Sequence, residues 1–159
     1  MQALPESSLE FLTSDAERLF ATELAEHQAA ATAITDQWLA KPPAGFQLSN
    51  VNWSAATVEE LYRLLLESDD EEFQKHVAMF LGEGLVRLCG WSWTIASLAS
   101  EYPGLKKYEF GVASRELRRI LFPYSKVHKA LDVTNTHARA SLLSFVRAYE
   151  SWNIPPKDM

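Results

Sequence analysis

The sequence predicts an α+β fold that is predominantly helical, with four to five helices packed on a small antiparallel three-stranded meander. Apolar residues recur at steps of three or four along most of the chain, as they do on one face of an α-helix. Residues 91–95 and 108–112 instead alternate in polarity, which is typical of half-buried strands. The 159 residues, 47% of them hydrophobic, are enough for one sizeable core. We therefore expect a single domain over residues 1–159, with residues 1–13 and 153–159 as flexible termini.

The first predicted helix begins at a capping box, in which Ser14 and Glu17 bond free backbone N–H groups. Its apolar stripe ends before the prolines at 42 and 43 and consists of Phe20, Leu24, His27, Ala31, Ile34 and Trp38. A histidine within such a stripe is more often a hydrogen-bonded core residue than a ligand or an acid–base group. We therefore expect a structural role for His27.

Two further helices are predicted before residue 90. Thr57 and Glu60 form a second capping box, and the helix that follows ends near Glu67. The next helix opens within the acidic run of residues 68–72 and turns an apolar side inward. Gly90 is expected to cap this helix, because glycine tolerates the left-handed backbone conformation common at that position.

The meander is predicted after this cap, with strands around residues 91–95, 108–112 and 120–122. Pro103 and Gly104 indicate the first turn. The third segment has a second interpretation, because residues 114–121 also fit a short helix.

Two helices are predicted at the C-terminal end. Pro123 suits the first turn of a helix that runs to about Leu131. The last helix is expected from about Thr134 to a point before the prolines at 155 and 156.

The most unusual local feature is Glu83, which stands between Gly82 and Gly84 inside an apolar helical pattern. A buried carboxylate costs several kcal/mol unless it is paired, and Arg87 is one helical turn away in the favourable orientation. A structural ion pair is the simpler interpretation, with the glycines allowing close approach of a neighbouring element. In the alternative interpretation, His76, Glu83 and Arg87 line the pocket of a small enzyme or ligand-binding domain.

Catalytic and metal-binding signatures are missing from the sequence. Its four histidines and single cysteine show no spacing typical of a metal site, and no motif identifies a nucleophile or a phosphate-binding loop. We therefore expect no metal, no cofactor and no enzymatic activity.

Composition also bears on where the protein resides and what it binds. Cys89 lies in an apolar segment and is expected to be a buried, inert thiol in a reducing compartment. The N-terminus does not resemble a secretory signal, and the longest apolar-leaning segment, residues 88–100, is shorter than the roughly 20 residues needed to span a bilayer. These features predict a cytoplasmic protein that does not associate with membranes. The net charge of −6 argues against nucleic-acid binding.

Charge is unevenly divided along the chain. Residues 1–83 carry 15 acidic and 4 basic side chains, a net charge of −11, whereas residues 84–159 carry 6 acidic and 11 basic side chains, a net charge of +5. The densest acidic run comprises Glu67, Asp69, Asp70, Glu71 and Glu72. Acidic residues stabilise a helix N-terminus, but the same run can form an anionic patch for a basic protein partner.

Trp91 and Trp93 are expected to have different roles. One indole is predicted in the core, and the other, Trp93, is a candidate anchor for a partner protein or for a second copy in a homodimer.

Three segments carry a resemblance to a protein family: residues 80–83 (Phe-Leu-Gly-Glu), 85–91 (Leu-Val-Arg-Leu-Cys-Gly-Trp) and 121–127 (Leu-Phe-Pro-Tyr-Ser-Lys-Val). Together they resemble small, uncharacterised bacterial domains that combine a Gly-Glu helix with a Gly-Trp strand start. The resemblance covers about residues 73–131, with Tyr124 in place of the usual phenylalanine. The wider pool of such domains includes immunity proteins of bacterial toxin systems. The resemblance therefore implies an α+β fold and an immunity-type toxin inhibitor, and it supplies no catalytic residue.

Overall fold

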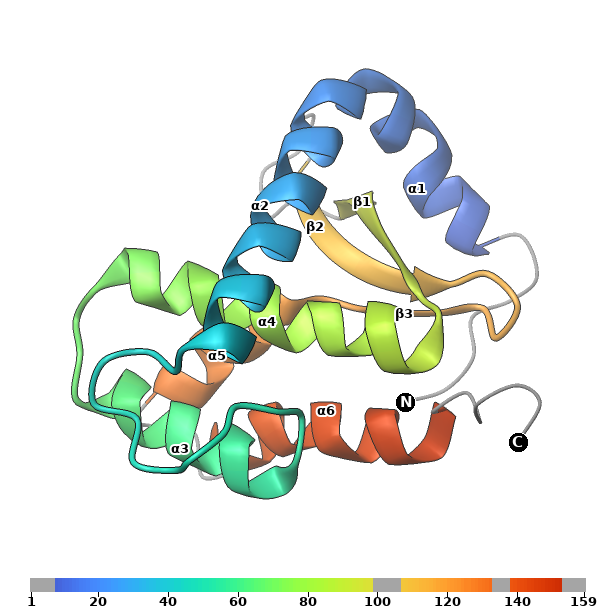
Figure 1. The fold of residues 1–159 in the computed structure, drawn as a ribbon. Coiled ribbons are helices and arrows are strands. Elements are labelled where there is room, and N and C mark those ends of the chain that lie inside the picture. The colour runs from blue at the N-terminus through green and yellow to red at the C-terminus, as the bar shows by residue number, and fades with distance from the viewer. Residues whose placement is uncertain (1–7, 99–106, 133–137, 153–159) are drawn as a thin grey trace.

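The computed structural model describes residues 8–98, 107–132 and 138–152. Those residues form six helices and one three-stranded sheet (Figure 1). In chain order the elements are α1 (Ser8–Leu19), α2 (Ala21–Ala40), α3 (Ala55–Leu66), α4 (Glu71–Cys89), β1 (Ser92–Leu98), β2 (Lys107–Ser114), β3 (Arg119–Leu121), α5 (Pro123–Leu131) and α6 (Ala138–Trp152). The predicted α+β class, predominantly helical with an antiparallel meander, is confirmed. The helices number six rather than four to five, because the first predicted helix is two helices.

The N-terminal boundary was predicted wrongly. Helix α1 begins at Ser8, so Ser14 lies inside it, exposed, and caps nothing. Residues 8–13, which the sequence analysis assigned to a flexible terminus, are helical, and Leu9 and Thr13 are buried in the core at 2% and 0% exposure. Tertiary packing decides this boundary, because α1 packs against β1. The rest of the predicted termini, residues 1–7 and 153–159, lies outside the described residues.

Helix α2 carries the predicted apolar stripe, and five of its six members are buried: Leu24, His27, Ala31, Ile34 and Trp38. Phe20, the sixth, is half-buried and stands at the break between α1 and α2, where its ring packs 4.7 Å from that of Tyr108. This contact attaches the break to the sheet.

Helix α3 begins three residues earlier than its predicted capping box. Ser54 is the N-cap, and its hydroxyl accepts a hydrogen bond from the Thr57 backbone N–H at 3.3 Å. Thr57 itself is buried and donates its hydroxyl to the side-chain oxygen of Asn52 at 2.7 Å. The capping-box pattern therefore predicted the helix correctly, but its N-cap is Ser54 and not Thr57.

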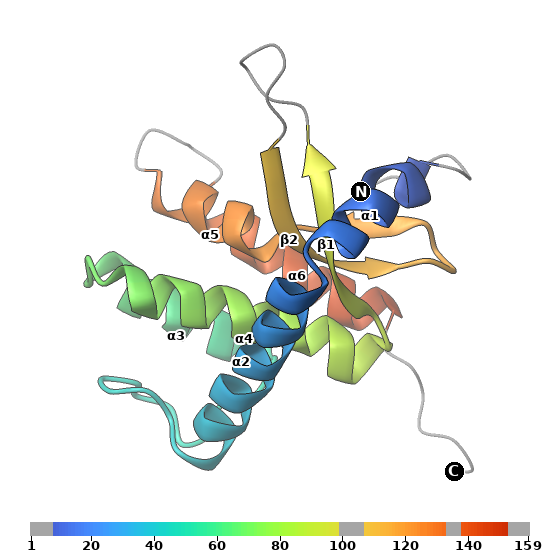
Figure 2. The same ribbon diagram turned by 90° about the horizontal axis from the view of Figure 1, so that it is seen from above.

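Helix α4 lies at the centre of the molecule and contacts α2, α5 and α6 as well as both long strands. Asp70 caps its start, and Gly90 ends it with the predicted left-handed conformation, at φ 73°. Seen from above, α2 crosses α4 and α1 lies beside β1 (Figure 2).

The sheet has the predicted meander order β1-β2-β3, and every pairing is antiparallel. Residues 119–121 form a strand, so the strand interpretation of residues 114–122 is confirmed and the helical one is wrong. A turn joins β2 to β3 and places Arg118 at φ 53°. The predicted turn at Pro103 and Gly104 lies outside the described residues.

Both predicted C-terminal helices are present. Pro123 occupies the first turn of α5, as expected, and α5 ends at Leu131. Helix α6 runs alongside α4 and also contacts α3 and α5. Helices and sheet share one hydrophobic core, which places Glu83 of α4 at the centre of the fold.

Candidate functional site

The buried carboxylate of Glu83 is fully engaged by neighbouring side chains. Glu83 is 3% exposed. Its Oε1 accepts a hydrogen bond from Trp93 Nε1 at 2.9 Å, and its Oε2 accepts one from Arg87 Nε at 3.0 Å. Charge-assisted hydrogen bonds of this kind compensate the desolvation of a carboxylate. The arrangement joins β1 to α4 and agrees with the structural interpretation of Glu83.

Arg87 extends this interaction toward the surface. Its Nη1 lies 2.9 Å from a carboxylate oxygen of Asp36 on α2, and its Nη2 donates to the Thr32 carbonyl at 3.5 Å. One guanidinium thereby joins α4 to α2. Burial acts to lower the pKa of Arg87, but the hydrogen bonds and charges of Glu83 and Asp36 together outweigh it, so the pKa is raised.

The two glycines beside Glu83 make room for aromatic rings. A Cβ added at Gly82 would stand 2.6 Å from Cζ2 of Trp93 and closer still to Cη2. A Cβ at Gly84 would stand 2.6 Å from Trp53 and 2.7 Å from Tyr149. The same rings donate hydrogen bonds to α4 carbonyls: Trp53 to Phe80 at 2.9 Å and Tyr149 to Leu81 at 2.5 Å. The predicted close approach is therefore made by aromatic side chains.

The structure does not bring His76 to the pair of Glu83 and Arg87. Nε2 of His76 lies 3.2 Å from a Glu72 carboxylate oxygen, and its ring meets Trp38 edge-on. None of the pockets described below is lined by any of these three residues. These pockets therefore give no support to the interpretation in which His76, Glu83 and Arg87 line one site.

Trp93 does not form the exposed anchor that the sequence analysis assigned to it. Its indole is 5% exposed and lies against Gly82, and Trp91 is also buried, at 3%. Helices cover the sheet where Trp93 lies, so both indoles are core residues. Trp93 is therefore not exposed to a partner or a second copy of the chain in this structure.

His27 belongs to a buried aromatic cluster that the sequence analysis recognised only as a core position. Its Nε2 and the hydroxyl of Tyr124 are 2.7 Å apart, and its ring stacks 4.2 Å from Phe110. Among the described residues, Nδ1 of His27 has no hydrogen-bond partner. Burial lowers the pKa of His27 to about 4, so the imidazole is neutral at pH 7. The apolar stripe of α2 indicated that His27 is buried. It could not indicate the partner, because Tyr124 lies 97 residues away in the chain.

The acidic run lies at the junction of α3 and α4 and is solvent-exposed. Glu67 forms the C-cap of α3 and pairs with Arg63, with Oε2 and Nη1 3.1 Å apart. Asp70 accepts the Glu72 backbone N–H at 2.9 Å as the N-cap of α4. Asp69 and Glu71 are exposed. Part of the run therefore stabilises helix ends, and the remaining negative charge faces solvent.

Beside this run is a pocket of about 440 Å³, which we name the acidic cleft. It lies between the loop after α2, the end of α3 and the start of α4, and its lining includes Pro43, Gly45, Leu64, Glu67, Asp70 and Phe73. Apolar side chains thus form its walls, and two carboxylates belong to its lining.

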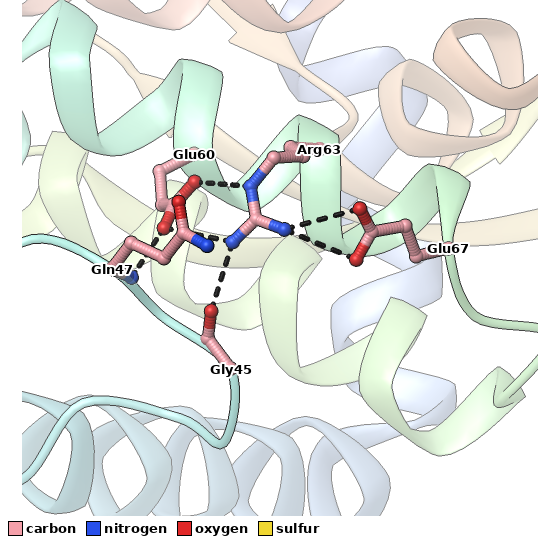
Figure 3. Close-up of polar contacts among 5 residues, drawn as sticks. All are labelled: Gly45, Gln47, Glu60, Arg63 and Glu67. Carbon is pink, nitrogen blue, oxygen red and sulfur yellow. Dashed lines mark hydrogen bonds and ion pairs between the residues drawn. The ribbon is translucent and has the colours of Figure 1, made fainter.

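An ion-pair network fixes the loop side of the acidic cleft (Figure 3). Arg63 donates to the carbonyl of Gly45 at 2.8 Å and also pairs with Glu60 and Glu67. Oε2 of Glu60, which also accepts a hydrogen bond from Arg63 Nη2 at 3.0 Å, accepts the backbone N–H of Gln47. Gly45 has φ 83°, which favours glycine, and the space for a Cβ there is limited by Leu64 at 3.1 Å. The loop is therefore held against α3.

Two other pockets adjoin one another beside α4 and α5. The larger, of about 410 Å³, also reaches β1 and β2 and includes Tyr108, Phe110 and Tyr124 in its lining. A smaller one of about 210 Å³ shares Lys75 and Tyr124 with it. Burial, followed by the charge of Glu72, raises the pKa of Tyr124, so its phenol stays protonated.

Three further features of the described residues are the reactivity of a thiol, the grouping of metal-binding side chains and the apolar character of the helices. Burial raises the pKa of the Cys89 thiol to about 11, which keeps it protonated and unreactive near neutral pH. Within residues 8–98, 107–132 and 138–152, no group of three metal-binding side chains comes together. In the same ranges, no helix has the length and apolar character needed to cross a membrane.

The structure is that of an α+β protein with an acidic cleft on its surface. No known protein-family model matches the chain, and neither a curated protein nor a solved structure matches it significantly.

Proposed function

We propose that this protein is a cytoplasmic protein-binding module, most concretely an immunity-type inhibitor of a bacterial toxin, which presents its acidic cleft to a basic partner surface. The observation that carries the proposal is the acidic cleft itself. Its apolar walls suit the methylene stem of a lysine or arginine side chain, and its carboxylates suit the charged end.

Charge around the acidic cleft supports the same partner chemistry. Two carboxylates, those of Glu67 and Asp70, line it, and Asp69, Glu71 and Glu72 are adjacent in the chain. Arg63 pairs with Glu67. Opposite potentials accelerate association and discriminate between partners. Toxins that act on nucleic acids tend to present basic surfaces, and a rigid acidic cleft can mask such a surface.

The contacts of the buried polar residues also favour a binding function over a catalytic one. The buried groups that first suggest chemistry, Glu83 and His27, are both held by core side chains. Glu83 accepts a hydrogen bond on each oxygen, which suits a structural carboxylate. The proposal is therefore a binding function without enzymatic activity.

The experiment is affinity capture from the native host with tagged protein, with stepwise salt elution and identification by mass spectrometry. The test variant is Glu67→Lys/Asp69→Lys, which spares the caps formed by Asp70 and the pair of Glu72 and His76. Its control, Glu23→Lys/Glu26→Lys, makes the same charge change at exposed positions on α2. We expect one stoichiometric partner that elutes at moderate salt and that only the test variant fails to capture.

With the purified partner, the association rate can be measured as a function of salt concentration. The association rate should fall about tenfold in the test variant at low salt, and the difference should shrink as salt rises. Co-expression with the partner should relieve the growth arrest that the partner causes alone. Equal loss of binding in both variants, or a partner without toxicity, contradicts the proposal.

A further inference from the structure

A separate pocket of about 380 Å³ lies between α5, α6 and the end of β3, and its lining is basic. It includes Lys126 of α5 and, at successive turns of α6, Ser144, Arg147 and Ser151. No acidic residue belongs to this lining, in contrast to the acidic cleft. We name it the basic pocket.

The two cations of the basic pocket have no counter-charge in contact within the described ranges. Among the residues that the structure describes, neither Lys126 nor Arg147 forms an ion pair or a side-chain hydrogen bond. Lys126 is half-buried, so its charge is only partly solvated. Burial and the neighbouring charge of Lys129 lower the pKa of Lys126, which indicates that an added anion would be stabilising there.

The first turn of α5 adds positive potential. Lys126 lies one turn from the start of α5, where backbone N–H groups favour a negative charge and disfavour a positive one. The first turn contains no acidic residue. Glu109, whose carboxylate accepts the Ser125 hydroxyl of this turn at 2.8 Å, does not line the basic pocket.

The rest of the lining is suited to an organic group. Leu121 and Trp152 contribute apolar surface. The guanidinium of Arg119 lies 4.7 Å from the centre of the Trp152 ring, which orients the indole and adds a third cation near the pocket. A volume of about 380 Å³ exceeds the space that a single phosphate needs and falls in the range of small-molecule sites.

We propose that the basic pocket binds a small organic phosphate, with Lys126 and Arg147 contacting the phosphate oxygens and Leu121 and Trp152 contacting the attached group. Two cations match a dianion, and guanidinium and hydroxyl donors suit the several acceptor oxygens of a phosphate. This activity is distinct from partner binding at the acidic cleft.

The test uses phenyl phosphate and inorganic phosphate as probes of the full-length protein at fixed ionic strength, with binding followed by NMR chemical shifts. Phenyl phosphate should bind saturably, shift resonances of α5 and α6, and bind at least severalfold more tightly than inorganic phosphate. Lys126→Met and Arg147→Met should each weaken phenyl phosphate binding about tenfold. Lys75→Met, the same change at an exposed lysine outside the basic pocket, should leave the affinity unchanged.

Each alternative result overturns the proposal. Absence of saturable binding excludes the site, equal binding by all variants places the anion elsewhere, and equal affinity for both probes excludes an organic phosphate. Because Arg147 is exposed, Arg147→Met keeps the test decisive even where Lys126→Met fails to fold. Glu67→Lys/Asp69→Lys should bind phenyl phosphate normally, which distinguishes failure here from failure at the acidic cleft.

Discussion

Glu83 shows how one buried charge is tolerated in the core. Each of its oxygens accepts a hydrogen bond, from Trp93 and from Arg87, and Arg87 reaches the surface, where it also meets Asp36. The charge is thus connected to solvent through a single guanidinium. Removing one partner of such a pair costs more than the pair contributes, because the other partner stays desolvated.

We predict that Glu83→Gln retains the fold and lowers the free energy of unfolding by about 1–3 kcal/mol, because the amide keeps an acceptor for Trp93 but loses its charge beside Arg87. Urea denaturation measures this difference. Asp36→Asn is the control, since Asp36 is 62% exposed and its loss should cost about 0–1 kcal/mol. Equal costs for the two variants would show that burial of Glu83 is energetically unimportant.

His27 makes stability depend on pH. Its pKa is about 4 in the folded protein and 6.5 when unperturbed, so between these values the unfolded chain binds a proton that the native state does not. We therefore expect the contribution of His27 to stability to fall as the pH decreases from about 6.5 to about 4. The full contribution of this group is about 3 kcal/mol.

His27→Gln should remove this dependence, because glutamine does not titrate. We predict that the wild-type protein loses more stability than the variant between pH 7 and pH 4, measured by urea denaturation at each pH. His128→Gln, at an exposed histidine of α5, is the matched control and should follow the wild-type profile. Parallel profiles for wild type and His27→Gln would contradict the prediction.

At the scale of elements, two glycines of α4 allow neighbouring aromatic side chains to pack directly against its backbone. Gly82 admits Trp93 of β1, and Gly84 admits Trp53 and Tyr149. Each indole or phenol also donates a hydrogen bond to α4, to Glu83 or to a backbone carbonyl. The distance between α4 and these elements is therefore set at two glycines.

We predict that Gly82→Ala destabilises the protein by about 1–3 kcal/mol through overpacking, although alanine is the better helix former by about 1 kcal/mol. In a Trp93→Phe background the same substitution should cost less, because the smaller ring vacates the space that a Cβ needs. A double-mutant cycle in urea measures the coupling. Additive costs would mean that Trp93 does not limit the space at Gly82.

The helix boundaries show which local signals are reliable. Gly90 and Pro123 act through their own backbone restrictions, and both were placed correctly from the sequence. The capping boxes at Ser14 and Thr57 were misplaced, because several serines and threonines near a helix start can serve as caps. At Ser54 the choice follows from the hydrogen bonds around Asn52 and Thr57.

At the scale of the whole molecule, helices and sheet contribute to one continuous core. Three tryptophans, Trp38, Trp91 and Trp93, are buried in it, and Trp53 and Trp152 pack against it. They belong to α2, to the segment around β1, to the α2–α3 loop and to α6. A core shared in this way favours cooperative unfolding of the entire chain.

We predict a single unfolding transition in which tryptophan fluorescence and far-UV circular dichroism change together, as expected for a small domain with one core. Measurement of both signals across one urea titration tests this. Two separated transitions would show that the α1–sheet region and the helices around α4 unfold independently.

Charge at this scale is divided between the two candidate sites. The acidic cleft is built from the negatively charged first half of the chain, and the basic pocket from the positively charged second half. The sequence identified the acidic run but not the cleft, because the loop around Gly45 is held beside it by contacts with Glu60 and Arg63 that are distant in the chain. The basic pocket had no sequence signal, since Lys126 and Arg147 are 21 residues apart and meet only through the packing of α5 on α6.

The sequence by itself determined the α+β class, the meander, the course of α2 and α4, and the pairing of Glu83 with Arg87, because periodicity, backbone restrictions and helical spacing are local properties. Only the tertiary structure decided that α1 belongs to the core, that Trp93 is buried, that His27 meets Tyr124, and that charged residues enclose two pockets. Each of these depends on which elements face one another, and burial and charge compensation are set by contacts between residues distant in the chain.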